Sequence, residues 1–357
     1  MRFLKILLYP ISFLYGLITF IRNQLFDNKI LKSTSFDIPV VCVGNLCYGG
    51  TGKTPLIEYI IRLLEDQTIK ISTLSRGYGR KTHGFIIADE NCDSKHIGDE
   101  PCQFYKKFKN ITVAVDEKRV RGVELLKKNE PELGVVLLDD AFQHRKVKAG
   151  LSILLTDFYN LYTNDYLLPT GTLREFKSGA SRADIIVVTK TPVVLSPITK
   201  KAIIDSLQIK AHQSVFFSQI KYGNLIPVGN DLMDINNHDK KFYTIILITG
   251  IANPYPLEEY LRRFCVELIL KKYKDHHEYT EDDLFDIKET FKYILGKNKI
   301  IVTTEKDMIR LRDSEKINFI KDLPIYYVPI EVDFHRADKE LFDKKIIKYV
   351  DENKANS

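Results

Sequence analysis

Short runs of apolar residues alternate along the first part of this chain with longer amphipathic segments. The runs occupy residues 40–43, 69–74, 111–115, 135–138, 151–155 and 185–188, and polar or charged residues follow each one directly. Strands that are buried on both faces of a parallel sheet have this continuous apolar character, and helices then cover the two faces. The pattern predicts an α/β fold with a parallel sheet, whose ligands bind at the carboxyl ends of the strands.

A second, smaller α/β unit is predicted to begin near residue 213, because apolar runs at 245–248, 300–302 and 325–328 repeat the pattern. The segment 230–241 is rich in Asn and Asp and is typical of a loop. We therefore expect four parts. They are an N-terminal helix in 1–30, a main domain in 31–212, a smaller domain in 213–330, and a C-terminal helix and tail in 331–357.

The amino terminus has a different character, with sixteen uncharged residues between Lys5 and Arg22. This stretch is just short of the ~17–25 residues that span a bilayer. No small-residue cleavage site follows it, which argues against a signal peptide. A helix buried against the rest of the protein remains an alternative. We favour an uncleaved helix that inserts into the membrane or lies along it, with Tyr9 and Tyr15 at the interface.

The composition of the chain indicates which partners and which cellular compartment are compatible with it. The net charge of +6 is spread along the chain without a long basic block, so nucleic-acid binding is not indicated, whereas attraction to an anionic membrane face is compatible with it. Five cysteines with no Cys-x-x-Cys pair argue for a reducing compartment and against disulfides or a zinc site. We expect the body of the protein on the cytoplasmic side of the membrane.

A glycine-rich loop follows the first apolar run and leads into an amphipathic helix. Backbone N–H groups of such a loop, together with those of the helix N-terminus, can surround a phosphate chain. The strict form of this motif has a glycine where this chain has Cys47. The loop predicts a P-loop NTPase-like domain that binds ATP and Mg²⁺, in which Lys53 reaches the outer phosphates and Thr54 holds the metal. The binding residues would be Gly49, Gly50, Thr51, Gly52, Lys53 and Thr54.

Two acidic pairs are candidates for the chemistry. Asp139 and Asp140 end an apolar run and could bind Mg²⁺, although a plain strand end would look the same. Asp99 and Glu100 lie in a Gly-Asp-Glu-Pro turn. Asp99 could accept the proton of a substrate hydroxyl, or it could simply cap a helix.

Three further groups of polar residues are candidates. The adjacent pair His276 and His277 could supply a histidine that tunes a carboxylate base, or could be an exposed turn. Arg174 could neutralise charge on a transferring phosphoryl group and Glu175 could join the metal ligands, unless 168–175 is a plain surface loop. Guanidinium groups that suit an anionic substrate are those of Arg76, Arg80 and Arg119.

Seven motifs in one order resemble those of the tetraacyldisaccharide 4′-kinase family, from the N-terminal helix to about residue 330. They are Val-Gly-Asn-Leu with Gly-Gly-Thr-Gly-Lys-Thr-Pro (43–55), Ser-Arg-Gly-Tyr-Gly (75–79), Gly-Asp-Glu-Pro (98–101), Leu-Asp-Asp-Ala-Phe-Gln-His (138–144), Leu-Pro-Thr-Gly-Thr-Leu-Arg-Glu (168–175), Asp-His-His (275–277) and Thr-Glu-Lys-Asp (304–307). Ala141-Phe142 stand where the family more usually has Gly-Leu or Gly-Phe.

The resemblance implies a membrane-associated lipid kinase of lipid A synthesis, bound to the cytoplasmic face of the inner membrane by its N-terminal helix. Such an enzyme transfers the γ-phosphate of ATP to the 4′-hydroxyl of a tetraacylated disaccharide 1-phosphate. It also implies that Asp99 is the base and that His276 tunes it, with His277 open as the alternative. The matching metal positions are Asp139, Asp140 and Glu175, and the other site positions are Arg76, Glu100, Arg119, Gln143, His144 and Arg174.

Two other classes of nucleotide-binding protein carry similar loops. Membrane-associated regulatory or partitioning ATPases resemble residues 49–54, but they have a lysine near the position of Tyr48. Metal-insertion GTPases would need clusters of Cys and His, which the chain lacks. The kinase is therefore the preferred interpretation, and the ATPase is the alternative.

Overall fold

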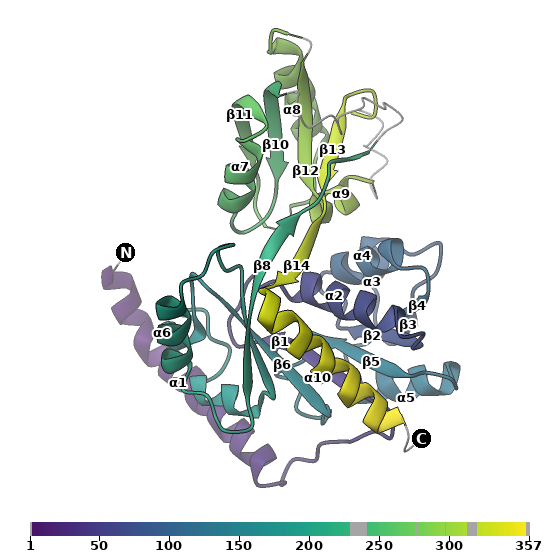
Figure 1. The fold of residues 1–357 in the computed structure, drawn as a ribbon, viewed down its shortest axis with the longest axis vertical. Helices are drawn as coiled ribbons and strands as arrows, with labels where there is room; N and C mark the ends of the chain where they lie inside the picture. The colour runs from purple at the N-terminus through teal and green to yellow at the C-terminus, as the bar shows by residue number, and fades with distance from the viewer. Residues whose placement is uncertain (1, 229–240, 276, 297, 313–319, 355–357) are drawn as a thin grey trace.

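The protein is described by a computed structural model for residues 2–228, 241–275, 277–296, 298–312 and 320–354. The chain forms two sheets, a nine-stranded one and a five-stranded one above it in Figure 1. The strand order of the large sheet is β14-β8-β7-β6-β1-β5-β2-β4-β3. All neighbouring strands in it are parallel except the outermost pairs β3–β4 and β8–β14. The predicted α/β fold with a large, mainly parallel sheet is confirmed.

The predicted apolar runs coincide with six strands of the large sheet, β1, β2, β4, β5, β6 and β7, and its other three strands were not predicted. Their bounds are β1 (Val40–Asn45), β2 (Ile71–Ser75), β3 (Ile86–Ile87), β4 (Ile111–Val115), β5 (Val135–Asp139), β6 (Leu151–Asp157), β7 (Ile185–Thr189), β8 (Ser214–Tyr222) and β14 (Ile330–Phe334). The helices of this domain are α1 (Arg2–Asp27), α2 (Lys53–Glu65), α3 (Ser94–Ile97), α4 (Asp99–Lys107), α5 (Arg119–Asn129), α6 (Pro197–Leu207) and α10 (Arg336–Lys354). Two short 3₁₀ helices span Tyr162–Asn164 and Lys177–Arg182.

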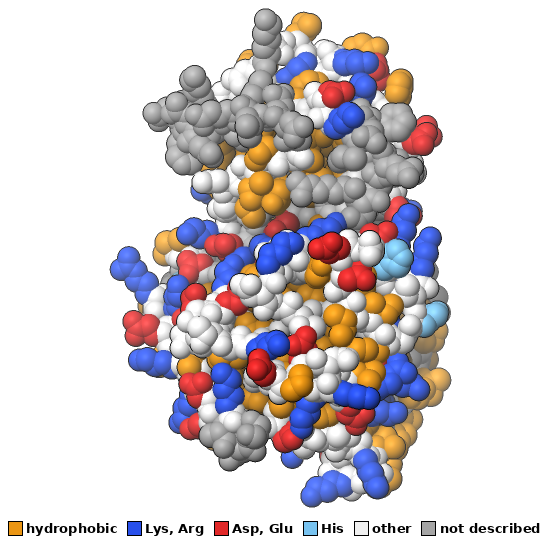
Figure 2. Space-filling model, turned by 90° about the vertical axis from the view of Figure 1, so that its right-hand side faces the viewer, with side chains coloured by type: hydrophobic (Ala, Val, Ile, Leu, Met, Phe, Trp, Pro, Cys, Tyr) orange, Lys and Arg blue, Asp and Glu red, His pale blue; other side chains and the backbone are white. Residues whose placement is uncertain are grey.

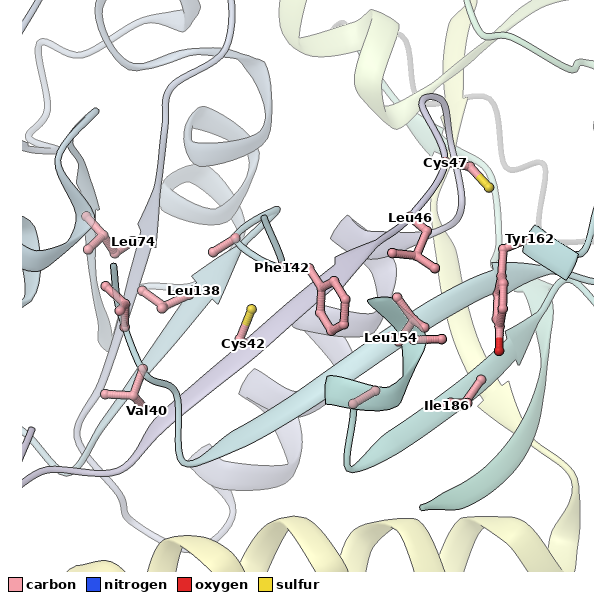
Figure 3. Packing of buried hydrophobic residues seen from close by; sticks show 14 of the residues in the cluster. Val40, Cys42, Leu46, Cys47, Leu74, Leu138, Phe142, Leu154, Tyr162 and Ile186 are labelled. Carbon is pink, nitrogen blue, oxygen red and sulfur yellow. The ribbon is translucent and has the colours of Figure 1, made fainter. Parts of the chain in front are cut away.

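Helices cover both faces of the large sheet, which explains why its central strands are apolar throughout. On one face Val40 and Cys42 of β1 belong to a cluster with Leu138 of β5 (Figure 3). Residues of α5 and α6 belong to the same cluster. On the other face Val41 and Val43 pack with residues of α2, α4 and α10. Alternate residues of β1 thus enter two different cores.

The small sheet has the strand order β11-β10-β12-β13-β9, with parallel pairing except between β9 and β13. Its elements are β9 (Ile226–Pro227), β10 (Phe242–Thr249), α7 (Tyr255–Leu261), β11 (Cys265–Lys272), α8 (Glu281–Tyr293), β12 (Lys299–Thr304), α9 (Glu305–Arg312) and β13 (Ile325–Val328). Helices α8 and α9 pack on one face and α7 on the other.

The predicted start of the smaller domain near residue 213 differs from the structure. Strand β8 pairs with β7 and belongs to the large sheet, and β14 returns to the same sheet beside β8. The small sheet is therefore inserted between two antiparallel neighbours of the large sheet, as Figure 1 shows. Apolar runs indicate strands but not the sheet to which each strand pairs, so the sequence placed this boundary too early.

Helix α1 packs against the large domain at the segment 167–176. The hydroxyl of Tyr15 donates to the carbonyl of Arg174 at 2.7 Å, and the backbone at Gly16 lies against Leu167 and Phe176. No helix in the described part of the chain has the length and apolarity to cross a bilayer. The alternative of a helix packed on the body therefore accounts for one face of α1, while its other face exposes large apolar side chains.

Candidate active site

The glycine-rich loop lies between β1 and α2 and has a conformation that depends on its glycines. Gly49 has a φ of 118° and Gly52 a φ of 86°, in the left-handed region that side chains with a Cβ rarely adopt. Gly52 also precedes Lys53, the first residue of α2. The free N–H groups of the α2 N-terminus are thus next to the loop, as an anion site requires.

Side chains from neighbouring strands brace this loop. Asn45 donates from Nδ2 to Oγ1 of Thr51 at 2.9 Å, and Thr189 donates from Oγ1 to the carbonyl of Thr51 at 2.8 Å. Lys190 reaches the carbonyl of Gly50 at 2.5 Å. These contacts fix the loop from β1 on one side and from the end of β7 on the other.

The two aspartates at the end of β5 lie beside the loop because β5 pairs with β1. Lys53 Nζ is 3.6 Å from Oδ1 of Asp140. Arg174 Nη1 donates to both carboxylate oxygens of Asp140 at 3.0 Å. The structure thus brings Lys53, Arg174 and Asp140 together, three of the residues that the sequence predicted.

Asp139 and Asp140 have opposite electrostatic environments although they are adjacent. Burial and the nearby charges of Asp140 and Glu100 raise the pKa of Asp139 to about 7. Burial would also raise the pKa of Asp140, but Lys53 and Arg174 outweigh it and lower that pKa. Oδ1 of Asp139 is buried and has no hydrogen-bond partner among the described residues. A buried, unpartnered carboxylate oxygen of this kind is suited to a cation.

The residues present fit a magnesium ion. No cluster of three or more Asp, Glu, His or Cys side chains that could hold a metal occurs within the described ranges. Mg²⁺ needs few protein ligands, because it usually combines one or two carboxylates with waters and substrate phosphates. Asp139, Asp140 and the Thr54 hydroxyl in the first turn of α2 match that requirement.

Asp99 is the first residue of α4 and contacts the small domain. Arg310 of α9 donates to Oδ2 of Asp99 from Nη2 at 2.7 Å and from Nε at 2.9 Å. The N-cap position of α4 is Gly98, and no side chain makes a capping hydrogen bond there. The alternative that Asp99 is only a helix cap therefore does not describe its contacts.

The turn that carries Asp99 is close to the rest of the site. A Cβ on Gly98 would be 2.9 Å from the carbonyl oxygen of Tyr78, so this turn packs directly on the 75–79 segment that follows β2. The charge of Glu100 contributes to the raised pKa of Asp139. The Asp99 turn and the acidic pair thus share one region at the carboxyl ends of the strands.

The buried cation Arg119 interacts electrostatically with Asp139 and Asp140. Arg119 is buried, and burial lowers its pKa to about 10. His144 is close to Arg119 and Arg76, and burial together with these cations lowers its pKa to about 4, so it is neutral near pH 7. Arg76 is exposed. Arg80, in contrast, forms an ion pair with Glu117, which makes it a poor candidate for binding a substrate anion.

Glu175, which the sequence predicts to join the metal ligands, is surrounded by hydrogen-bond donors in this structure. Its carboxylate accepts hydrogen bonds from Asn23 Nδ2 at 2.7 Å, Gln143 Nε2 at 3.0 Å and Arg182 Nη2 at 2.8 Å. Gln143 also donates to the carbonyl of Asn45 at 2.9 Å. Glu175 thus connects α1 to the end of β1 in this structure, and its assignment as a metal ligand stays a prediction.

The structure describes one of the two adjacent histidines, His277. His277 bonds through Nε2 to Oδ2 of Asp283 at 2.8 Å and stacks on Tyr273 with ring centroids 4.7 Å apart. His276 lies outside the described residues. Asp283 lies in the first turn of α8 and forms the capping box of that helix with Thr280. The hydrogen bond of His277 therefore involves the N-terminus of α8.

Sequence reasoning missed two residues at this site. Arg310 lies one helical turn after the Thr-Glu-Lys-Asp motif, which signals its helix but not its partner. Asn23 lies near the end of the N-terminal helix that we interpreted as membrane-associated. Its polar side chain gave the sole hint in the sequence of a contact with the body of the protein. Both contacts join segments that are far apart in the sequence, and no local pattern reveals such a pair.

Comparison with known families gives a consistent result. The family model described as tetraacyldisaccharide-1-P 4′-kinase matches residues 4–350. Proteins named tetraacyldisaccharide 4′-kinase include one from Flavobacterium psychrophilum, 49% identical with all of both chains covered, and one from Flavobacterium johnsoniae, 46% identical with 99% of each chain covered. A third, from Bacteroides thetaiotaomicron, is 45% identical and covers 98% of this chain and 94% of its own. These matches do not favour the alternative of a regulatory ATPase.

A solved structure agrees with the sequence comparison. The "apo" form of LpxK from Aquifex aeolicus, described as a complex with ATP, superposes with a TM-score of 0.71 at 27% identity and covers 97% of this chain and 99% of its own. The match extends over both sheets. The chain therefore belongs to the tetraacyldisaccharide 4′-kinase family.

Proposed function

We propose that this protein transfers the γ-phosphate of ATP to the 4′-hydroxyl of a tetraacyldisaccharide 1-phosphate, a step of lipid A biosynthesis. The relatives are named tetraacyldisaccharide 4′-kinase. The observation that supports the proposal most directly is the arrangement of three groups at one edge of the large sheet. The glycine-rich loop, the Asp139–Asp140 pair and the Asp99 turn all lie at the carboxyl ends of neighbouring strands. Phosphoryl transfer to an alcohol needs these three kinds of group together.

The residues around the loop would bind and orient the phosphates. Backbone N–H groups of residues 49–54 and the start of α2 surround the phosphate chain, and Lys53 and Arg174 compensate its negative charge. Both cations are held by Asp140, which keeps their charged groups within reach of the same point. Such preorganised charge stabilises the transferring phosphoryl group without reorganisation during the reaction.

Thr54, Asp139 and Asp140 would hold the magnesium ion. When bound, Mg²⁺ neutralises charge on the phosphate oxygens. Asp139 must be ionised to act as a ligand, and its pKa of about 7 means that a proton competes with the cation near neutral pH.

Asp99 would act as the general base. It accepts the proton of the acceptor hydroxyl as that oxygen forms its bond to phosphorus, and the bond between the γ-phosphorus and the leaving oxygen of ADP breaks. The ion pair with Arg310 holds Asp99 in place at the junction of the two domains. His276 is proposed as its tuning partner on the family resemblance, and Arg76, Arg119 and His144 as the groups that contact the acceptor.

Helix α1 would place this site at the membrane surface. Its outward face exposes Phe13, Leu14, Leu17 and Ile18, while its inner face bonds to the residues around Glu175. An apolar face of this kind can lie in the headgroup region of a bilayer, where an acylated substrate resides. We infer that the protein works at the cytoplasmic membrane face with α1 along the interface.

A transfer assay tests the proposed function. Purified protein is incubated with radiolabelled ATP, Mg²⁺ and the tetraacyldisaccharide 1-phosphate in detergent micelles, and the lipid fraction is examined by thin-layer chromatography. We expect lipid-borne label with the wild type and a loss of at least about 100-fold with Lys53→Ala, the range for removing one preorganised charge. Chelation of the metal should also stop the transfer.

Lys292→Ala is the matched control, because Lys292 is an exposed lysine of α8 that pairs only with Glu289 among the contacts of the described residues. It should retain full activity. Label that appears only as free phosphate in the presence of the acceptor would contradict the proposed kinase activity. It would support the alternative of an ATPase.

A further inference from the structure

We propose that Arg310, held in turn by the buried Asp307, is a positioning residue that links the small domain to Asp99. This inference rests on the proposed role of Asp99 as the base. The three residues form a chain of ion pairs that crosses the junction between α4 of the large domain and α9 of the small domain. Figure 2 shows side chains of both charges gathered along the waist between the two domains.

The contact between Arg310 and Asp99 has the geometry of a positioning contact. Two N–H groups of one guanidinium meet the same carboxylate oxygen, at 2.7 and 2.9 Å. The Arg310 side chain is only 6% exposed, so solvent screens this pair weakly. A planar guanidinium that makes two bonds fixes direction as well as distance, which a single point charge cannot do.

Asp307 fixes Arg310 to the small sheet. Asp307 is fully buried and bonds to Nη1 of Arg310 at 3.3 Å. It also accepts from the backbone N–H of Gly250 at 3.0 Å and from the hydroxyl of Thr304 at 2.7 Å. Gly250 follows β10 and Thr304 ends β12, so these contacts tie Arg310 to two neighbouring inner strands of the small sheet.

The same link reaches the segment that carries the adjacent histidines. A Cβ on Gly250 would lie 2.8 Å from the carbonyl oxygen of Lys274 and 3.4 Å from Cβ of His277. The turn held by Asp307 is therefore packed on Lys274 and His277. The orientation of Asp99 and the position of this segment are set by one group of contacts.

A neighbouring ion pair crosses the same junction without touching Asp99. Glu305 of α9 bonds to Lys107 of α4 at 2.8–2.9 Å. Loss of this pair would weaken the contact between the helices, but Lys107 would keep its pair with Glu58. Glu305→Gln thus separates the general effect of the junction from a specific effect on Asp99.

Removal of Arg310 should lower the rate of the chemical step and leave nucleotide binding unchanged. We expect Arg310→Met to lower kcat about 30-fold or more, because a small displacement of a reacting group costs up to about 100-fold. The KM for ATP should change less than about twofold, since the hydrogen bonds that brace the phosphate loop come from β1 and the end of β7. Arg310→Lys should recover part of kcat, because it restores the charge but not the pair of guanidinium hydrogen bonds.

The decisive experiment is a double-mutant cycle on the full-length protein in the transfer assay, with Asp99→Asn, Arg310→Met and the double variant. If Arg310 acts through Asp99, Arg310→Met lowers kcat in the wild type but by less than about twofold in the Asp99→Asn background. Equal losses in both backgrounds would overturn the proposal. A loss with Glu305→Gln as large as that with Arg310→Met would also overturn it, as would a rise in activity on removing Arg310.

Failure of the inference and failure of the proposed function give different results. Asp99→Asn without effect would refute the base assignment itself. Asp99→Asn with a large effect beside an unaffected Arg310→Met would refute only the positioning role. Circular dichroism checks folding of each variant, and if Arg310→Met does not fold, the same cycle with Arg310→Lys decides.

Discussion

At the scale of the residue, Asp139 combines burial with a missing partner. Its carboxylate lies at the end of a strand that is buried on both faces, and Oδ1 has no partner within the described residues. In the protein without metal, burial and its acidic neighbours raise its pKa to about 7, well above the unfolded value of about 3.8. The folded state therefore binds more protons than the unfolded state between about pH 4 and 7, and this group makes the protein less stable as the pH rises through that window.

We expect Asp139→Asn to remove this loss of stability with rising pH in metal-free buffer. Relative to the wild type, the variant should gain stability at pH 8 compared with pH 5, by about 1 kcal/mol or more, because the amide does not ionise. Thermal or urea unfolding in the presence of EDTA measures the difference. Asp157→Asn, at the end of β6 and paired with Lys190, is a control that should show no such gain.

The sequence predicted the places of several site residues but not their partners. A carboxylate after an apolar run had to lie at the edge of the sheet, so Asp139 and Asp140 could be found. The contacts of Glu175 with Asn23 and Gln143 could not be predicted, because these partners are 152 and 32 positions away in the sequence. Arg310 was missed for the same reason, since its partner Asp99 precedes it by 211 positions.

At the scale of the element, α1 has two faces with different surroundings. Its inner face bonds to the 167–176 segment and to Arg145, whose Nη1 donates to the carbonyl of Asn23 at 2.8 Å. Its outer face exposes Phe13 (70%) and Ile18 (60%). The sequence predicted a helix here from sixteen uncharged residues, but hydrophobicity alone could not show which side meets protein.

We expect the double substitution Phe13→Glu and Ile18→Glu to weaken binding to anionic vesicles at least about tenfold. The loss of two apolar side chains that would insert into the headgroup region and the added repulsion from the lipid charge both act in this direction. Vesicle sedimentation measures the binding, and the thermal midpoint should stay within a few degrees of the wild type because both side chains are mostly exposed.

Phe285→Glu provides the matched control for that experiment. Phe285 is 64% exposed on α8 of the small domain, far along the chain from α1. This variant should bind vesicles as the wild type does. Equal losses for the control and for the α1 variant would show that added negative charge, rather than the α1 face, reduces binding.

At the scale of the whole molecule, the small domain is an insertion between β8 and β14. Tyr222 and Ile330 are cross-strand partners at the point where the chain leaves and returns. The sequence predicted both domains from the repeat of apolar runs, but it assigned β8 to the wrong one, since antiparallel pairing with a strand 100 residues later has no local pattern. The site is nevertheless shared, because Asp99 and Arg310 come from different domains.

We expect the large domain to bind ATP without the small one. Replacement of residues 223–329 by an Asn-Gly turn would join Tyr222 to Ile330 as a hairpin with the existing register. The shortened protein should keep its affinity for ATP within about tenfold, because the phosphate loop is built from β1, α2 and β7. It should show no transfer to lipid, because Arg310 and the 274–277 segment are absent.

Isothermal titration calorimetry measures the affinity, and a Lys53→Ala version of the shortened protein is the control that should not bind. A folded shortened protein without affinity for ATP would show that the small domain contributes directly to the nucleotide site.

The insertion also sets an order for folding during synthesis on the ribosome. Every strand of the small sheet emerges before β14 and α10, which complete the edge and one face of the large sheet. The inserted unit can thus finish folding while its host still exposes the apolar surface that Phe342, Ile346 and Val350 later cover. A nascent chain that pauses in that interval exposes apolar surface on one face of the large sheet. Premature termination just after residue 328 would leave a product prone to aggregate.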